Sequence, residues 1–391
     1  GGLAVWRLGL RWRLSGLVSA IGGLLYAFSG ANLSLCCVLN LVPYLWLAPL
    51  FLWMLEVHLA ERNASSTVRL GLAAALLATV AEPIMLTGLL AIAVARLAAV
   101  LWRAAPAVKG RTALAAVLAL LLAIGVAAPV IWEEVRLLGA TPRMTQNLQD
   151  IRNYSFHPLM AHGFWIPNPF GLDFSLQGDF AGRHLTHGRI PYIYSVFIGF
   201  ASLGFMVWAL WPPRRNIALA AAASAGLFFL LALGPYFPPL HLLTRLLPGL
   251  SWARYSEKFL FFTAGALLLL LLAGLDRLIE GWAAPGRKRL PLLVAMLLAA
   301  ALPLAAGALI PGSSLKCLGP FSLGALAACA VAIGLRLHGF GRPEILAGLA
   351  GLALLAELMA GNAFTQPVTD RALFTGRVPI LALSGGTGSG H

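Results

Sequence analysis

Long apolar runs separated by short polar segments dominate this chain from one end to the other. A run of about 20 apolar residues is long enough to cross the hydrocarbon core of a bilayer as an α-helix. Eleven segments fit that description at least approximately. They are residues 14–28, 39–55, 68–81, 83–102, 112–132, 191–211, 217–233, 259–279, 290–310, 321–337 and 343–359. We therefore predict an all-α integral membrane protein with about eleven transmembrane helices.

Composition supports the membrane interpretation and excludes other classes. Hydrophobic residues make up 60% of the 391 residues, charged residues 11%, and the mean hydropathy is +0.84. Soluble domains carry about 25% charged residues, so a soluble or disordered chain is excluded. We expect one multi-pass domain over residues 1–360, with a long loop at 133–190, followed by a tail over 361–391. The four cysteines lack the spacing of a zinc site.

The net charge of +14 comes from basic residues that stand mostly between apolar runs. Such an excess can indicate a nucleic-acid partner, but no separate basic domain is present, so we expect none. Basic residues in short loops mark the cytoplasmic side of a membrane protein. Placing Arg214, Arg215 and the basic run 287–289 inside puts the N-terminal side inside and the C-terminal tail outside. Residues 133–190, 234–258 and 361–391 then share the outer face.

Glu82 is the most unusual acid in the sequence because it lies between two apolar runs, directly before Pro83. An ionisable residue at membrane depth suggests a function. The alternative is a hydrated helix cap at the membrane boundary, with Pro83 as the first helical residue.

A second candidate site precedes the apolar run at 259–279. Arg254 and Lys258 flank the expected helix start, Arg245 can add a third cation, and Ser256 can cap the helix. Helix N-termini bind anions, so this segment predicts a phosphate site. Alternatively, Glu257 answers the helix dipole and pairs with a neighbouring cation.

The long loop carries a third group of polar residues. Asn168 is enclosed by Pro167, Pro169 and Gly171, which predicts a rigid turn. Asp173 and Asp179 follow it, and amides and carboxylates among aromatic rings suit the hydroxyl groups of a sugar. An ordinary loop with solvated charges is the alternative. His184 and His187 alone are weak evidence for a metal, so we assign no metal site, and a divalent ion has no support.

Several short segments, in this order and spacing, resemble the YfhO-like family of bacterial multi-pass membrane proteins. They are residues 7–9, 24–30, 39–40, 46–49, 81–83, 167–171, 233–236, 247–250 and 254–259. That family belongs to the GT-C class of lipid-sugar-dependent glycosyltransferases. The resemblance implies a GT-C-like fold in the bacterial inner membrane and transfer of a sugar from a polyprenyl-phosphate carrier to an envelope glycan acceptor. It also implies that the usual catalytic carboxylate lies in an outer loop upstream of this segment.

The mechanism that these expectations favour is a single displacement. Glu82, the carboxylate assigned as catalytic within this chain, orients or deprotonates the acceptor hydroxyl. Arg254 and Lys258 stabilise the leaving polyprenyl phosphate, and membrane lipid surrounds the helices. Two alternatives remain open: a transporter or flippase of lipid-linked sugars, and a non-catalytic scaffold in an envelope complex. Transporters usually contain broken helices with charges near the midplane.

Overall fold

The computed structural model describes most of the chain, and every regular element within the described residues is helical. The described ranges are 1–80, 82–139, 154–171, 180–186, 191–211, 215–239, 255–280 and 289–363. Within these ranges, six helices are long and apolar enough to cross a membrane, or up to seven when the bent pair α2 (Gly16–Phe28) and α3 (Gly30–Cys36) is taken as one span. The class of the fold is therefore an all-α membrane protein.

The longer helices coincide with predicted runs. The helices that meet the length and composition test by themselves lie in α4 (Tyr44–Glu61), α6 (Pro83–Arg103), α7 (Pro106–Gly139), α12 (Leu260–Glu280), α14 (Pro320–Leu337) and α15 (Pro343–Gly361). However, α4 and α7 extend past their predicted ends, so residues 133–139 of the predicted loop 133–190 are helical. Three further predicted runs form apolar helices whose tested segments are shorter, namely α5 (Ala64–Thr79), α10 (Arg215–Ala232) and α13 (Arg289–Leu309). α1 (Gly2–Arg11) is helical where we expected only a basic segment, because Ala4, Leu8 and Gly9 give it a buried face.

The predicted helix over 191–211 is wrong in its first half. Residues 191–201 form an irregular, mostly buried segment, and only α9 (Ser202–Ala209) is helical. Gly199 has a φ of +107°, a left-handed conformation that interrupts any helix. The apolar residues of this segment are mostly buried, but in an irregular chain rather than in a membrane-spanning helix.

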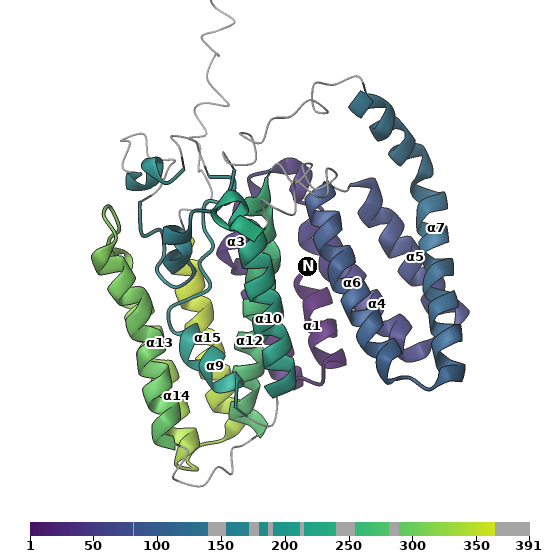
Figure 1. Ribbon diagram of the computed structural model, residues 1–391. Helices are drawn as coiled ribbons and strands as arrows, with labels where there is room; N and C mark the ends of the chain where they lie inside the picture. The colour runs from purple at the N-terminus through teal and green to yellow at the C-terminus, as the bar shows by residue number, and fades with distance from the viewer. Residues whose placement is uncertain are drawn as a thin grey trace, which may run out of the picture.

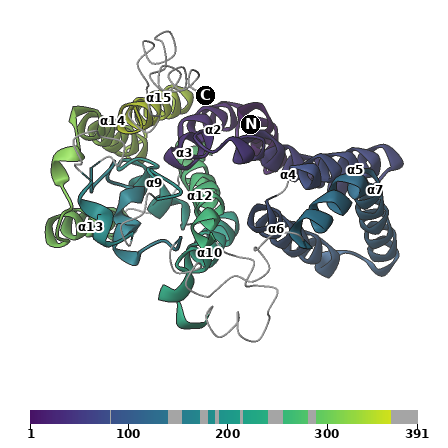
Figure 2. The ribbon, with the colours of Figure 1, turned by 90° about the horizontal axis from the view of Figure 1, so that it is seen from above.

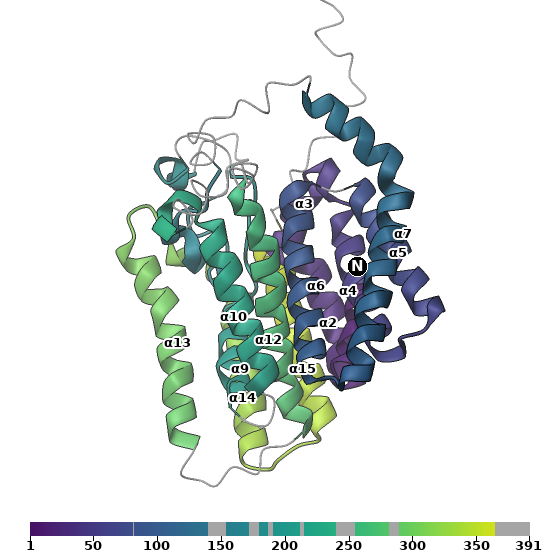
Figure 3. The same cartoon turned by 45° about the vertical axis from the view of Figure 1, so that its right-hand side comes forward.

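The helices form two groups when the molecule is viewed from above (Figure 2). One group contains α4, α5, α6 and α7, with α5 packed along both α4 and α7. The other contains α2, α9, α10, α12, α14 and α15, with α12 in contact with α2, α9, α10 and α15. α1 connects the groups by packing on α2 and α4. α13 and α7 stand at opposite edges (Figure 3).

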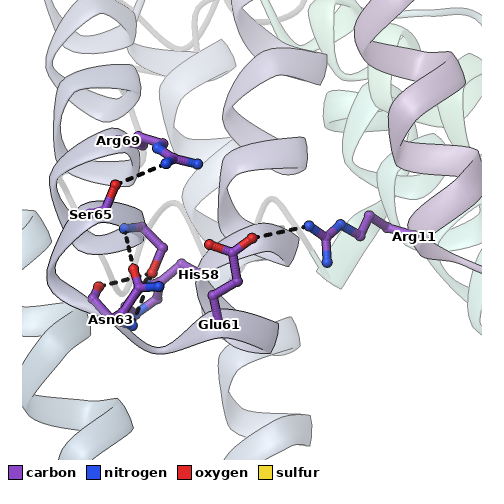
Figure 4. Close-up of polar contacts among 7 residues, drawn as sticks. Arg11, His58, Glu61, Asn63, Ser65 and Arg69 are labelled. Carbon is purple, nitrogen blue, oxygen red and sulfur yellow. Dashed lines mark hydrogen bonds and ion pairs between the residues drawn. The ribbon is translucent and has the colours of Figure 1, made fainter.

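The two groups are tied together at the lower end of Figure 1, where α1 and α4 both finish. Arg11 of α1 makes an ion pair of 3.3 Å with Glu61 of α4 (Figure 4). The chain then reverses through Arg62, whose φ is +52°, and Asn63 caps α5 by accepting the Ser66 amide. The Ser66 hydroxyl accepts the Asn63 amide in return, which completes a capping box.

Basic side chains gather at this same lower end. The helices α6, α12 and α14 all run downward in Figure 1, and each has an arginine in its last turn: Arg103, Arg277 and Arg336 respectively. The loop-rich end with α3 and the 3-10 helices lies opposite. The molecule thus has a basic end and a loop end, the separation that the charge pattern predicts for a membrane protein.

Candidate functional site

The strongest candidate site is a buried ion pair at the loop end. Lys258 Nζ lies 2.8 Å from Glu82 Oε1, and the two side chains are only 3% and 15% exposed. Both residues were predicted functional on separate grounds, and the structure brings them into direct contact. Because both charges are buried, loss of either partner would leave an uncompensated charge, which costs far more than breaking a surface pair worth about 0–1 kcal/mol.

Glu82 is held by its position at the start of α6. It is the N-cap residue, its carboxylate accepts the amide of Met85 at 3.3 Å, and Pro83 occupies the first turn. The hydroxyl of Tyr44 donates to the backbone carbonyl of Glu82 at 3.4 Å. The predicted helix cap and the predicted functional acid are therefore the same residue, because one carboxylate oxygen caps α6 while the other meets Lys258.

Lys258 is enclosed by aromatic rings as well as by Glu82. Its ammonium lies 4.7 Å from the ring centroid of Tyr192 and 4.5 Å from that of Tyr255, both within cation–π range. Tyr154 packs against Tyr255 with centroids 4.5 Å apart. Burial raises the pKa of Tyr192 above its usual value, and the negative charge of Glu82 raises it further. The tyrosine rings and one carboxylate thus fix the ammonium in place.

The segment before α12 differs in detail from its prediction. Residues Ser256–Phe259 form a 3-10 helix, η7, and the Ser256 side chain makes no cap. Its hydroxyl instead bonds the Ser155 hydroxyl at 3.1 Å and donates to the carbonyl of Ala232 at 3.3 Å. The prediction of Ser256 as a helix cap is wrong, because those partners from the long loop and α10 occupy the hydroxyl.

Glu257 has a structural task that its sequence position did not reveal. Its carboxylate accepts the amides of Tyr192 and Ile193, both at 3.1 Å, so it anchors the start of the irregular segment 191–201. The Glu257 amide donates to the Tyr154 carbonyl at 3.1 Å, which joins η7 to the long loop. Glu257 therefore positions Tyr192, one of the rings around Lys258.

Glu357 of α15 anchors the other end of the same segment. It is fully buried, and it accepts the amides of Phe200 at 2.7 Å and Ala201 at 3.3 Å. Glu357 was not among the predicted site residues. The available signal was an acid inside the apolar run 343–359 rather than in its first turn, where Glu344 lies, and an ionisable residue among apolar ones is the criterion that singled out Glu82.

Among the predicted sugar-binding residues, Asn168 is described. It has a φ of +42°, which agrees with the rigid turn, and its side-chain amide donates to the Gly361 carbonyl at 3.3 Å. The Asn168 side chain therefore fastens the long loop to the end of α15. Asp173, Asp179, Arg245, Arg254 and His187 lie outside the described residues. Within the described ranges, no group of three His, Cys, Asp or Glu side chains could hold a metal ion.

An apolar cavity of about 230 Å³ lies between the two helix groups. Its wall comes from α1, α2, α4, α6, α10 and α12, and includes Leu89, Phe228, Phe262 and Gly265. Phe262 is about one helical turn beyond Lys258, and Leu89 is about two turns along α6 from Glu82. These wall residues are therefore one to two helical turns from the ion pair, toward the basic end, so the pair lies on the loop-end side of the cavity.

No family model, no curated protein and no solved structure matches the chain. The function is therefore inferred from the fold and the site. What the fold and composition define is a multi-pass, all-α membrane protein with a buried ion pair at its loop end.

Proposed function

We propose that this protein is a glycosyltransferase of the bacterial inner membrane that transfers a sugar from a polyprenyl-phosphate carrier to an envelope glycan on the outer face. The observation that carries the proposal is the adjacency of the Glu82–Lys258 pair and the apolar cavity. The donor has the matching chemistry, an anionic phosphate joined to a long hydrocarbon chain. A GT-C-like arrangement of about eleven helices, with the loop end outside, belongs to this proposal.

Glu82 and Lys258 have different roles in the proposed reaction because they carry opposite charges. The acceptor hydroxyl oxygen attacks the anomeric carbon, the bond from that carbon to the phosphate oxygen breaks, and the hydroxyl proton passes to the Glu82 carboxylate. The leaving phosphate gains negative charge, which Lys258 stabilises in a site shielded from water. The tyrosine rings contact the ammonium without neutralising it, so they keep it in position for an anion at the site.

The isoprenoid chain occupies the cavity. The wall is mostly hydrocarbon, with few polar groups such as Ser224 and Trp12, so a lipid tail is better suited to it than a free sugar. Arg245 and Arg254, as further phosphate ligands, and Asn168, Asp173 and Asp179, as acceptor ligands, complete the proposed site.

The test is transfer activity with a polyprenyl-phosphate-linked sugar and purified envelope glycan, in nanodiscs that contain the full-length protein. Lys258→Met should lower the turnover by about 30- to 150-fold, the effect of about 2–3 kcal/mol of lost charge-assisted stabilisation. Lys316→Met is the matched control, because Lys316 is an exposed lysine at the same end, between α13 and α14. Equal turnover in both variants at equal expression would contradict the proposal.

A transporter or flippase of lipid-linked sugars is the second candidate, because one observation favours it. The irregular segment 191–201 is buried among helices, and α2 and α3 are bent by 46°. Discontinuous elements of this kind line the substrate sites of many transporters. The two functions separate in sealed vesicles: a flippase moves labelled lipid-linked sugar across the bilayer without acceptor, whereas a transferase yields free polyprenyl phosphate and glycosylated acceptor.

A further inference from the structure

The two residues assigned to opposite roles in the proposed reaction are bonded to each other. Glu82 is to receive a proton and Lys258 is to hold a phosphate, yet Nζ and Oε1 are 2.8 Å apart. While that contact persists, the carboxylate oxygen faces an ammonium rather than an acceptor hydroxyl, and the ammonium is already paired with an anion. The structure therefore describes a resting arrangement in which neither group is ready for its role.

Burial determines when this arrangement can change. Because Lys258 is 3% exposed and Glu82 is 15% exposed, water cannot readily replace either partner. Removing one partner from a buried pair leaves an uncompensated charge, which is strongly unfavourable. A second anion at Lys258 removes that penalty for the ammonium, and Glu82, the more exposed of the two, can then turn toward an acceptor hydroxyl.

The surroundings of Lys258 favour such a change of partner. The Tyr192 and Tyr255 rings contact the ammonium independently of Glu82 and keep it in place. Glu82 retains its own anchor, because its second carboxylate oxygen accepts the Met85 amide. A lipid whose tail lies in the cavity presents its phosphate about one helical turn from Phe262, which is the position of Lys258.

We propose that the phosphate of the bound lipid displaces Glu82 from Lys258, so that the Glu82 carboxylate is released only when the donor is in the site. This inference rests on the proposed function and adds a specific order of events to it: phosphate binding precedes the appearance of a free base. Without lipid the base remains paired with Lys258, which protects the protein from unproductive proton transfer and hydrolysis.

The proposal makes an unusual prediction for binding. If Glu82 competes with the phosphate for Lys258, removing the charge of Glu82 should tighten the binding of the lipid. Glu82→Gln keeps the size and an oxygen to cap α6. We expect it to bind polyprenyl phosphate without a sugar at least about tenfold more tightly than the wild type. Lys258→Met should bind it at least about tenfold more weakly, and Lys316→Met should match the wild type.

Binding is measured in nanodiscs of zwitterionic lipid, with polyprenyl phosphate, uncharged polyprenol and inorganic phosphate as separate probes. The lipid-phosphate source requires that only polyprenyl phosphate shows the Glu82 and Lys258 dependence. The same dependence with inorganic phosphate would assign the site to the free anion and overturn the lipid proposal. Isotope-edited infrared spectroscopy of the wild type adds a measurement that does not depend on a variant folding: the Glu82 carboxylate band should shift when polyprenyl phosphate binds.

The outcomes separate this inference from the proposed function. If the wild type does not bind polyprenyl phosphate, or if Lys258→Met binds it equally well, the proposed phosphate site fails. If Lys258→Met weakens binding but Glu82→Gln weakens it too or leaves it unchanged, the phosphate site stands and the exchange is wrong. Glu82 would then hold Lys258 in position for the phosphate.

Discussion

Ser34 and Ser195 exchange two hydrogen bonds across the loop end. The Ser195 amide donates to the Ser34 hydroxyl at 2.8 Å, and that hydroxyl donates to the Ser195 carbonyl at 3.1 Å. One side chain thereby satisfies both backbone groups of a residue in the irregular segment 191–201. Backbone groups buried without water or regular structure require such partners.

Removing that hydroxyl should therefore destabilise the protein. We expect Ser34→Ala to lower the free energy of unfolding by about 1–3 kcal/mol, because the Ser195 amide and carbonyl lose a buried partner. Ser65→Ala is the control: Ser65 is exposed and bonds only the neighbouring Arg69 in Figure 4, so its loss should cost less than about 0.5 kcal/mol. Thermal unfolding in detergent measures both variants, and equal midpoints would contradict the prediction.

Substitution of Glu357 should destabilise the protein more than substitution of Ser34. Glu357→Ala leaves the amides of Phe200 and Ala201 without their acceptor, and we expect a loss of about 2–4 kcal/mol. Glu357→Gln retains one acceptor oxygen, so its cost should fall between those of the wild type and Glu357→Ala. Glu344→Ala, near the other end of α15, serves as the control. A Gln variant no more stable than the Ala variant would contradict the assignment of the effect to hydrogen-bond acceptance.

His162 predicts a dependence of stability on pH. Its Nδ1 lies 2.8 Å from the Leu159 carbonyl, so this nitrogen carries the proton and Nε2 accepts from the Ser313 hydroxyl at 2.8 Å. Burial lowers the pKa of His162 below its ordinary value, and the bond to Leu159 offsets this only in part. The unfolded chain therefore binds the proton more readily than the folded protein does.

The direction of the pH dependence of stability follows from the lowered pKa of His162 in the folded protein. The contribution of His162 is fully present above a pH of about 6.5, the pKa of an unperturbed histidine, and is lost as the pH falls through the lower folded-state pKa. Unfolding midpoints between pH 7.5 and 5 should fall more steeply in the wild type than in His162→Gln. Parallel curves for the two proteins would exclude His162 as the cause.

Substitution of Gly265 tests whether the lipid occupies the apolar cavity while the surrounding packing stays intact. It lines the apolar cavity, and a Cβ added there meets no atom within 4 Å. Gly265→Leu should fill part of the cavity and weaken binding of polyprenyl phosphate, while unfolding stability stays unchanged or rises by up to about 1 kcal/mol because glycine is a poor helix former.

Gly348→Leu is the matched control for that experiment. Gly348 also has open space beside it and lies within a helix, but it does not line the cavity. Its substitution should leave lipid binding at the wild-type level. Equal weakening by both substitutions would place the lipid elsewhere.

Local sequence alone was sufficient for most of the helices. Most of the apolar runs became helices, although α4 and α7 run past their predicted ends, because a helix satisfies its own backbone hydrogen bonds within a membrane-length segment. The start of α6 is likewise determined by local sequence. The N-cap Glu82, Pro83 and the Met85 amide that Glu82 accepts are all close neighbours in the chain. The basic end could be predicted from the sequence for the same reason, because charges at helix ends are a local pattern.

Tertiary structure decided everything that joins distant segments. The sequence indicated that Glu82 and Lys258 were unusual, but only the packing of α6 against η7 made them partners. The segment 191–201 has the apolar composition of a membrane-spanning helix. It can stay irregular because Glu257, Ser34 and Glu357, on other elements, bond its backbone groups. Hydropathy records how strongly a residue avoids water. It does not record which distant side chain will satisfy a buried backbone group, and that assignment arises only when the helices pack.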